Sequence, residues 1–70
     1  MAKSIPALVN KEMLSWARIH AGYNTIQEAA SKTKITEKNL TAWENGEKNP
    51  SLRQAEKLAN YYHCSFSIFS

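Results

Sequence analysis

Residues 25–46 read T-I-Q-E-A-A-S-K-T-K-I-T-E-K-N-L-T-A-W-E-N-G, and this stretch contains two helix-start signals eleven residues apart. Thr25 is followed three residues later by Glu28, which predicts a capping box in which each side chain accepts from the other residue's backbone N–H. Thr36 stands between apolar Ile35 and an acidic residue, which predicts a second helix start. The sequence therefore predicts two consecutive helices, at about residues 26–33 and 37–45.

The link between these helices is short, about three residues, and such a link is typical of a helix-turn-helix. The first helix is expected to bury Ala29 and Ala30, and the second to bury Leu40 and Trp43. Gly46 is expected to end the second helix in a left-handed conformation. The other face of the second helix is expected to be exposed and available to a binding partner. It carries Glu37, Lys38, Thr41, Ala42 and Asn45.

Length and composition describe one small domain. The chain has 70 residues, a net charge of +3 and a pI near 9.2. A core of this size supports about 3–5 kcal/mol of stability and argues against a large catalytic cleft. A mildly basic charge permits nucleic acid as a partner without requiring it. There is no apolar run long enough for a membrane span and no signal-peptide pattern, so we expect a cytoplasmic protein with no membrane contact.

The rest of the chain predicts a short arm and three more helical segments. Residues 1–9 are expected to form an extended arm whose Ile5, Leu8 and Val9 lie against the domain formed by residues 10–70. The other helices are predicted at about residues 11–21 and 52–62, with a short turn at 66–69 whose Phe66 and Phe69 close the core. The chain stops directly after these aromatic residues, which is typical of a domain cut from a longer protein or of a very compact complete one.

The sequence contains no catalytic or metal-binding pattern. Cys64 is the only cysteine, and a structural thiol is the favoured interpretation because no cation lies beside it in sequence. The two histidines are far apart, so we expect no metal and no cofactor. The two tryptophans at helical spacing, Trp16 and Trp43, are interpreted as structural rather than as base-stacking platforms. Three lysines either solvate a helix face or contact phosphate: Lys32, Lys34 and Lys38.

A known family shares several of these features in the same order. W-E-N-G at 43–46, a proline at position 50 and the helix S-L-R-Q-A-E-K-L-A resemble the Cro and cI repressor-like (Xre) helix-turn-helix domains, over about residues 10–69. More narrowly, S-I-P-A-L-V-N, M-L-S-W-A-R, E-A-A-S-K and the closing S-I-F look like the domain ahead of zinc metallopeptidases of the ImmA/IrrE type. The resemblance implies an all-α, five-helix bundle whose third helix enters the DNA major groove.

The resemblance also implies roles for individual residues. It implies base contacts by Glu37, Lys38 and Ala42, with Thr41 beside them. It implies phosphate contacts by Thr25, Gln27, Asn45 and Lys48. Arg18 falls inside the apolar stripe of the first helix, where a charge needs a buried partner. In domains of this kind such an arginine pairs with the glutamate of W-E-N-G, which implies an ion pair between Arg18 and Glu44.

Three positions differ from the family pattern and leave two functions open. Ile26 has no donor for a phosphate, Lys34 stands where glycine is common and must adopt a left-handed backbone or a different turn, and Glu37 is acidic. The first hypothesis is a sequence-specific DNA-binding transcriptional regulator, prophage-like or stress-linked, that binds double-stranded DNA; a homodimer would suit it. The alternative is a protein-interaction or regulatory module of a larger ImmA/IrrE-type or antitoxin-like protein, with weak or no DNA binding. Its partner would be a peptide, a toxin or a C-terminal domain of a longer parent chain.

Overall fold

Four α-helices and one 3-10 turn make up the fold in the computed structural model, which describes residues 5–70. The elements are α1 (Lys11–His20), α2 (Ile26–Thr33), α3 (Glu37–Glu44), α4 (Leu52–Tyr61) and the 3-10 turn η1 (Phe66–Phe69). The prediction of an all-α fold is confirmed, although the fifth element is a single 3-10 turn rather than an α-helix. Residues 1–4 of the predicted arm lie outside the described part of the chain.

Each helix begins where a polar side chain caps its first N–H groups. Asn10 accepts from the backbone N–H of Glu12 at 2.9 Å and starts α1. The capping box of Thr25 with Glu28 is present at α2, and Ser51 forms a second one at α4. Thr36 caps α3. A cap of this kind stabilises a helix by about 1 kcal/mol, so the helix starts are fixed by local chemistry.

Three helices end in the same hydrogen-bonded motif. At α1, α3 and α4 the residue after the cap has a left-handed backbone, and these residues are Gly22, Gly46 and His63. The next residue then donates its N–H to a carbonyl five residues back, as in the bond from Glu47 to Ala42 at 2.9 Å. This is the Schellman arrangement, and it turns the chain sharply out of each helix. As a result α1, α3 and α4 end at His20, Glu44 and Tyr61, one residue before the predicted ends.

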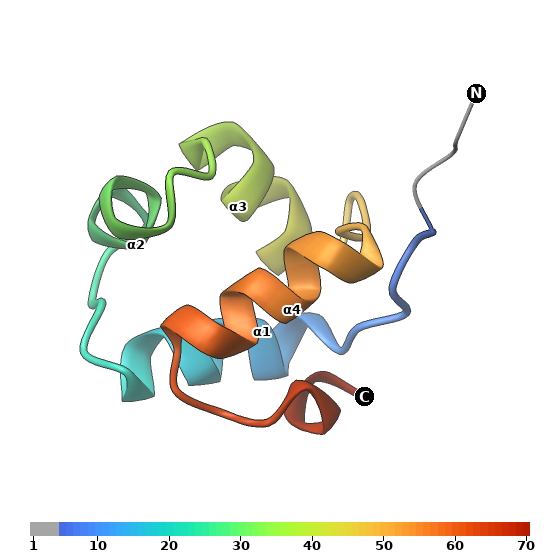
Figure 1. Cartoon of the computed structure of the whole chain (residues 1–70). Helices are drawn as coiled ribbons and strands as arrows, with labels where there is room; N and C mark the ends of the chain where they lie inside the picture. The colour runs from blue at the N-terminus through green and yellow to red at the C-terminus, as the bar shows by residue number, and fades with distance from the viewer. Residues whose placement is uncertain (1–4) are drawn as a thin grey trace.

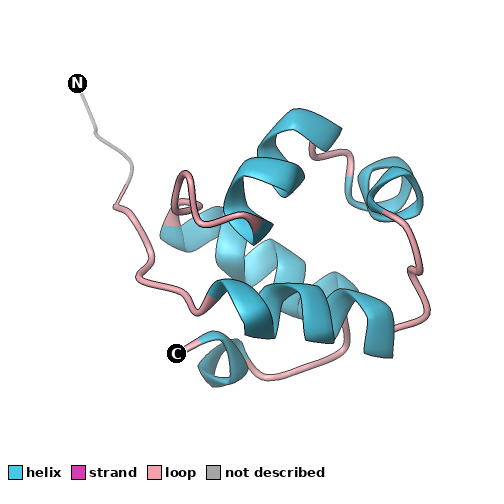
Figure 2. Ribbon diagram, turned by 180° about the vertical axis from the view of Figure 1, so that it is seen from behind, coloured by secondary structure: helices cyan, strands magenta, loops and turns pink. Residues whose placement is uncertain are grey.

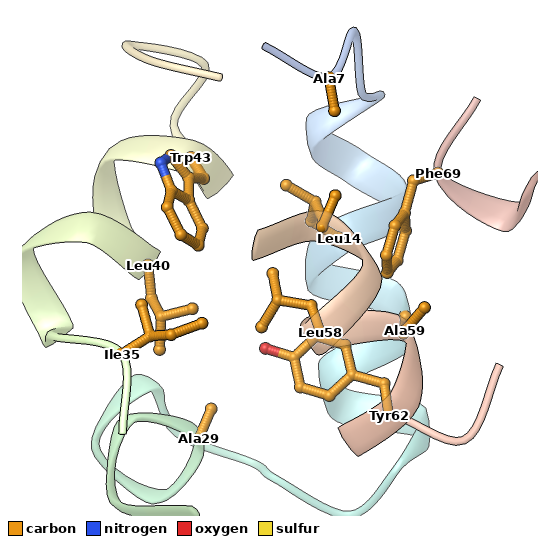
Figure 3. Close-up of a cluster of buried hydrophobic side chains, with 12 residues drawn as sticks. Ala7, Leu14, Ala29, Ile35, Leu40, Trp43, Leu58, Ala59, Tyr62 and Phe69 are labelled. Carbon is orange, nitrogen blue, oxygen red and sulfur yellow. The ribbon is translucent and has the colours of Figure 1, made fainter. Parts of the chain in front are cut away.

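The buried side chains converge on one core (Figure 3). Its largest members, each 3% exposed or less, come from α1, α3, α4 and η1: Leu14, Leu40, Trp43, Leu58 and Phe69. Burying one such side chain stabilises the fold by about 1.5–3 kcal/mol. From α2 the core receives the small side chain of Ala29, which is fully buried. In Figure 1, α1 and α4 cross the lower half of the molecule and α2 and α3 lie above them, so the helix-turn-helix rests on α1 and α4.

Two predictions about the chain ends are wrong in part. On the arm, Ile5 and Leu8 are 66% and 85% exposed, whereas Ala7 is buried and Val9 packs against the core. The arm pairs through its backbone with the residues before α4, and this pairing turns Ala7 inward and the two larger side chains outward. At the other end, Phe66 is 36% exposed and only Phe69 closes the core, because a 3-10 turn of four residues buries one side of itself.

Within residues 5–70, no helix has the length and apolar character that crossing a membrane requires.

Candidate nucleic-acid interface

The turn between α2 and α3 is built on one left-handed residue and one buried hydroxyl. Lys34 has φ 63 and ψ 18, so it adopts the left-handed backbone rather than a different turn. Thr33, which is fully buried, donates its hydroxyl to the carbonyl of Ala29 at 2.8 Å and accepts from the N–H of Ile35 at 3.2 Å. The turn is therefore fixed from inside, which sets the direction of α3 relative to α2.

The outer face of α3 carries exposed polar side chains next to a buried apolar side. Glu37, Lys38 and Thr41 are exposed, while Leu40 and Trp43 are in the core. Figure 2 shows the molecule from behind, with α1 in front and α3 above it on the outside of the bundle. Three of the four residues predicted to contact bases therefore share an accessible helix face.

The prediction that Ala42 lies on this free face is wrong. Ala42 is 8% exposed. The reason is the Schellman motif at the end of α3, in which the backbone N–H groups of Glu47 and Lys48 both donate to the carbonyl of Ala42, at 2.9 and 3.4 Å. The chain folds back over this residue, and the loop that follows α3 covers its side of the helix.

Helix α3 and the loop that follows it line an open hollow of about 470 Å³. Its lining consists of Glu37, Lys38, Thr41, Ala42, Glu47 and Lys48. Two of these side chains are positive and two are negative, so the hollow has charged walls of both signs. Lys48 and Asn45, which were predicted to contact phosphate, are exposed.

The start of α2 is joined to the start of α3 by a side-chain hydrogen bond. Gln27 donates from Nε2 to Oε1 of Glu37 at 3.2 Å. Sequence reasoning assigned these two residues to phosphate and to base contacts separately and missed the bond, because nothing in their spacing shows that the two helix starts meet. The bond holds one oxygen of Glu37 and leaves Oε2 for another donor.

Thr25 is exposed, but its backbone N–H and its hydroxyl are already hydrogen-bonded to Glu28. Its N–H donates to Glu28 Oε1 at 3.0 Å, and its hydroxyl accepts from the N–H of Glu28 at 3.1 Å and lies 3.3 Å from the same carboxylate oxygen. A phosphate at Thr25 would compete with this capping box. Ile26, the next residue, is half-buried and packs against the core, so its side chain has a structural use.

Arg18 and Glu44, the pair implied by the resemblance, are in direct contact. Nε of Arg18 donates to Oε2 at 2.8 Å and Nη2 donates to Oε1 at 3.1 Å, while Nη1 donates to the carbonyl of Tyr23 at 2.8 Å. The hydrogen bonds that Arg18 donates to Glu44 raise the pKa of the guanidinium, against the opposing effect of burial. These three bonds tie α1, the loop after it and α3 together, so they fix the orientation of the helix that carries the exposed face.

Lys11 is a residue near this surface that sequence reasoning did not single out. Its side chain crosses Gly46, where its Cδ and Nζ lie 3.0 and 3.7 Å from the position that a Cβ would occupy. Gly46 has φ 79, and the absence of a side chain leaves room for the lysine stem. In the sequence, only Gly46 pointed to this contact. Besides ending α3, the glycine provides a surface on which the stem of Lys11 packs.

The remaining candidate groups are not arranged for chemistry. In the described range, residues 5–70, there is no group of three or more His, Cys, Asp or Glu side chains that could hold a metal ion. His20 stacks on Trp16 with ring centroids 4.6 Å apart. Cys64 is half-buried, and burial raises the pKa of its thiol, which favours the unreactive protonated form.

Comparison with known proteins agrees with this geometry. A family model described as helix-turn-helix matches residues 14–69, which is most of the chain, and no curated protein matches it. The match spans every helix except the first turn of α1, and it includes the capped pair, the left-handed turn and the exposed face of α3. The chain therefore belongs to the Cro/cI-like helix-turn-helix family, which is a family of DNA-binding domains.

Proposed function

We propose that this domain is a sequence-specific, DNA-binding transcriptional regulator that inserts α3, beginning at Glu37, into the major groove. The observation that carries the proposal is the exposed polar face of α3, held rigidly on the core by the Arg18–Glu44 pair and joined to α2 by the Gln27–Glu37 bond. An α-helix fits the major groove of B-form DNA, where each base pair presents a distinct set of donors and acceptors. A helix that is fixed on the core and carries three exposed polar side chains is suited to reading that pattern.

The base-reading roles follow from the chemistry of each side chain. Glu37 would accept from the amino group of cytosine through its free oxygen, and Lys38 would donate to the acceptors of guanine. Thr41 would offer its hydroxyl to either kind of group or its methyl to thymine. Ala42 is not among the proposed contacts because the loop covers it.

The phosphate contacts would flank this helix on both sides. Gln27 lies at the start of α2, and Asn45 and Lys48 lie beyond the end of α3, all with exposed side chains. Thr25 would take part only if its capping box opened. A homodimer would place two α3 helices about one helical turn, roughly 34 Å, apart and so read a palindrome.

The test is a fluorescence-anisotropy titration with random duplex DNA over a range of salt concentrations. We expect binding whose log K falls linearly with log salt, and the slope should become shallower by about 0.9 for each phosphate-contacting lysine replaced by alanine. Lys48→Ala should therefore flatten the slope. Lys57→Ala removes an equal charge from an exposed position on α4 and is the matched control, with no expected change in slope. No binding at low salt would refute the proposal.

A second function is favoured by specific observations. The hollow beside α3 is lined by two carboxylates, Glu37 and Glu47. A carboxylate that does not accept a hydrogen bond from a base repels the DNA phosphates. On α1, Trp16 and Ile19 are 48% and 52% exposed, and exposed aromatic side chains can anchor a protein partner. These features fit a protein-interaction module of a longer ImmA/IrrE-type or antitoxin-like protein. Reading the coding frame beyond residue 70 tests this alternative: an in-frame H-E-x-x-H supports it and a stop codon opposes it.

A further inference from the structure

The arm is bonded to the residues that lead into α4. Ala7 donates its N–H to the carbonyl of Pro50 at 2.8 Å, and Leu52 donates its N–H to the carbonyl of Ile5 at 2.6 Å. Pro6 and Ser51 form an antiparallel β-bridge between these bonds. Figures 1 and 2 both show this segment running beside the loop that joins α3 to α4.

Burial shows that this pairing is held by the backbone and by one small side chain. Ala7 is 5% exposed, and its partner Pro50 is among the fully buried side chains. The large side chains of the arm, Ile5 and Leu8, are 66% and 85% exposed and take little part. Ala7 belongs to the buried core cluster, so the arm is held by its backbone bonds together with the burial of this one small side chain.

The first residue of α1 touches the other end of the loop. The stem of Lys11 lies across Gly46, at the end of α3. The loop is therefore held by α1 at Gly46, by the carbonyl of Ala42 at the N–H groups of Glu47 and Lys48, and by the arm at residues 50–52. Its middle, residues 47–49, is exposed, and Glu47 and Lys48 line the hollow beside α3.

We infer that residues 5–7 of the arm are a positioning element that holds the α3–α4 loop so that Lys48 can contact a DNA phosphate. This inference rests on the proposed function. A loop released at one end would have to be ordered again each time Lys48 met a phosphate, and ordering a flexible segment on binding costs affinity. With the arm in place, that ordering has already occurred during folding. The arm thus acts on DNA through Lys48 and needs no contact with DNA itself.

The experiment compares two variants that carry the same new charge on adjacent residues. Ala7→Asp puts a carboxylate at a buried position and should detach the arm. Leu8→Asp puts it at an exposed position and should leave the pairing intact. Anisotropy titrations with random duplex DNA at several salt concentrations give the slope of log K against log salt. We expect the slope of Ala7→Asp to be shallower than that of Leu8→Asp by about 0.9, the value for one phosphate contact.

Combining the variants with Lys48→Ala separates positioning from general destabilisation. In the Leu8→Asp background Lys48→Ala should flatten the slope, whereas in the Ala7→Asp background it should have no further effect. Partial unfolding lowers the apparent affinity but leaves the slope of the folded fraction unchanged. Equal slopes for Ala7→Asp and Leu8→Asp, or an undiminished effect of Lys48→Ala in both backgrounds, would overturn the inference.

A second variant keeps the test available if Ala7→Asp does not fold. Leu52 is the first residue of α4, a position that favours proline, and Ser51 before it has φ −69 and ψ 162, a conformation that proline accepts in its predecessor. Leu52→Pro therefore removes the N–H that bonds to Ile5 while preserving the helix start. It should flatten the salt slope as Ala7→Asp does; an unchanged slope would count against the inference.

A readout without DNA distinguishes failure of this inference from failure of the proposed function. Trypsin can cut between Lys48 and Asn49, and a loop released by the arm should be cut faster in Ala7→Asp than in Leu8→Asp. Equal cutting rates would show that the arm does not hold the loop. If the wild-type domain binds no DNA, the proposed function fails; if it binds normally and the variants share one slope, only the role of the arm fails.

Discussion

Neutralising Glu44 removes the counter-charge of an arginine that the fold has buried. The side chains of Arg18 and Glu44 are 9% and 11% exposed, and two hydrogen bonds of 2.8 and 3.1 Å join them. Solvent therefore screens little of their attraction. In Glu44→Gln an amide replaces the carboxylate, and its NH₂ group faces the donors of the guanidinium, so at least one of the two bonds is lost.

The expected loss is close to the whole stability of the domain. Leaving one charge of a buried pair without its partner costs about 3–5 kcal/mol, and a domain of this length is stable by about 3–5 kcal/mol. We therefore expect Glu44→Gln to be largely unfolded at room temperature. Replacing both partners, as in Arg18→Met with Glu44→Leu, removes the stranded charge, and replacing a buried pair by apolar residues is often neutral or stabilising. The double variant should recover most of the loss.

Urea denaturation followed by far-ultraviolet circular dichroism measures these free energies. Fluorescence adds a local probe, because Trp43, adjacent to Glu44, is 3% exposed. Glu47→Gln makes the same change of charge at an exposed position and is the control, with an expected effect within about 0.5 kcal/mol. A loss below about 1 kcal/mol for Glu44→Gln is typical of an exposed ion pair and would refute the view that this pair holds α1 against α3.

Two further changes test the turn and the core. Lys34 has a left-handed backbone, so Lys34→Gly should raise the free energy of unfolding by about 0.5–1 kcal/mol; Lys32→Gly, in the last turn of α2, should lower it by about 1 kcal/mol, and a fall in both would contradict the strain argument. The hydroxyl of Tyr62 is buried and has no hydrogen-bond partner among residues 5–70, and burial, followed by the nearby charge of Glu44, raises its pKa above the ordinary value. The folded protein then keeps this proton at alkaline pH while the unfolded chain loses it. The contribution of Tyr62 to the free energy of unfolding should therefore be constant below about pH 10 and fall by up to about 1.4 kcal/mol per pH unit above it. Tyr62→Phe should be at least as stable at neutral pH and should lose this dependence, whereas coincident pH profiles of variant and wild type would contradict the reasoning.

The sequence alone determined the helices and where they begin. Thr25 with Glu28 and Thr36 cap their helices as predicted, and Gly46 follows the end of α3 in the left-handed conformation. These signals depend on groups within about one turn of each other, so residue type and spacing suffice to interpret them. The apolar stripes also specified which face of each helix is buried, and the place of Arg18 in such a stripe showed that it needed a buried partner.

Contacts between segments that are far apart in the chain follow from the tertiary packing. The bond between Gln27 and Glu37 depends on the angle that Lys34 and Thr33 give to the turn. The burial of Ala42 depends on the path of the chain after α3, and the exposure of Leu8 depends on the pairing of the arm with residues near α4. Each of these contacts joins segments whose relative position is set by packing across the whole core. Helical periodicity specifies which face of one helix is buried. It contains no information about which distant segment packs against that helix.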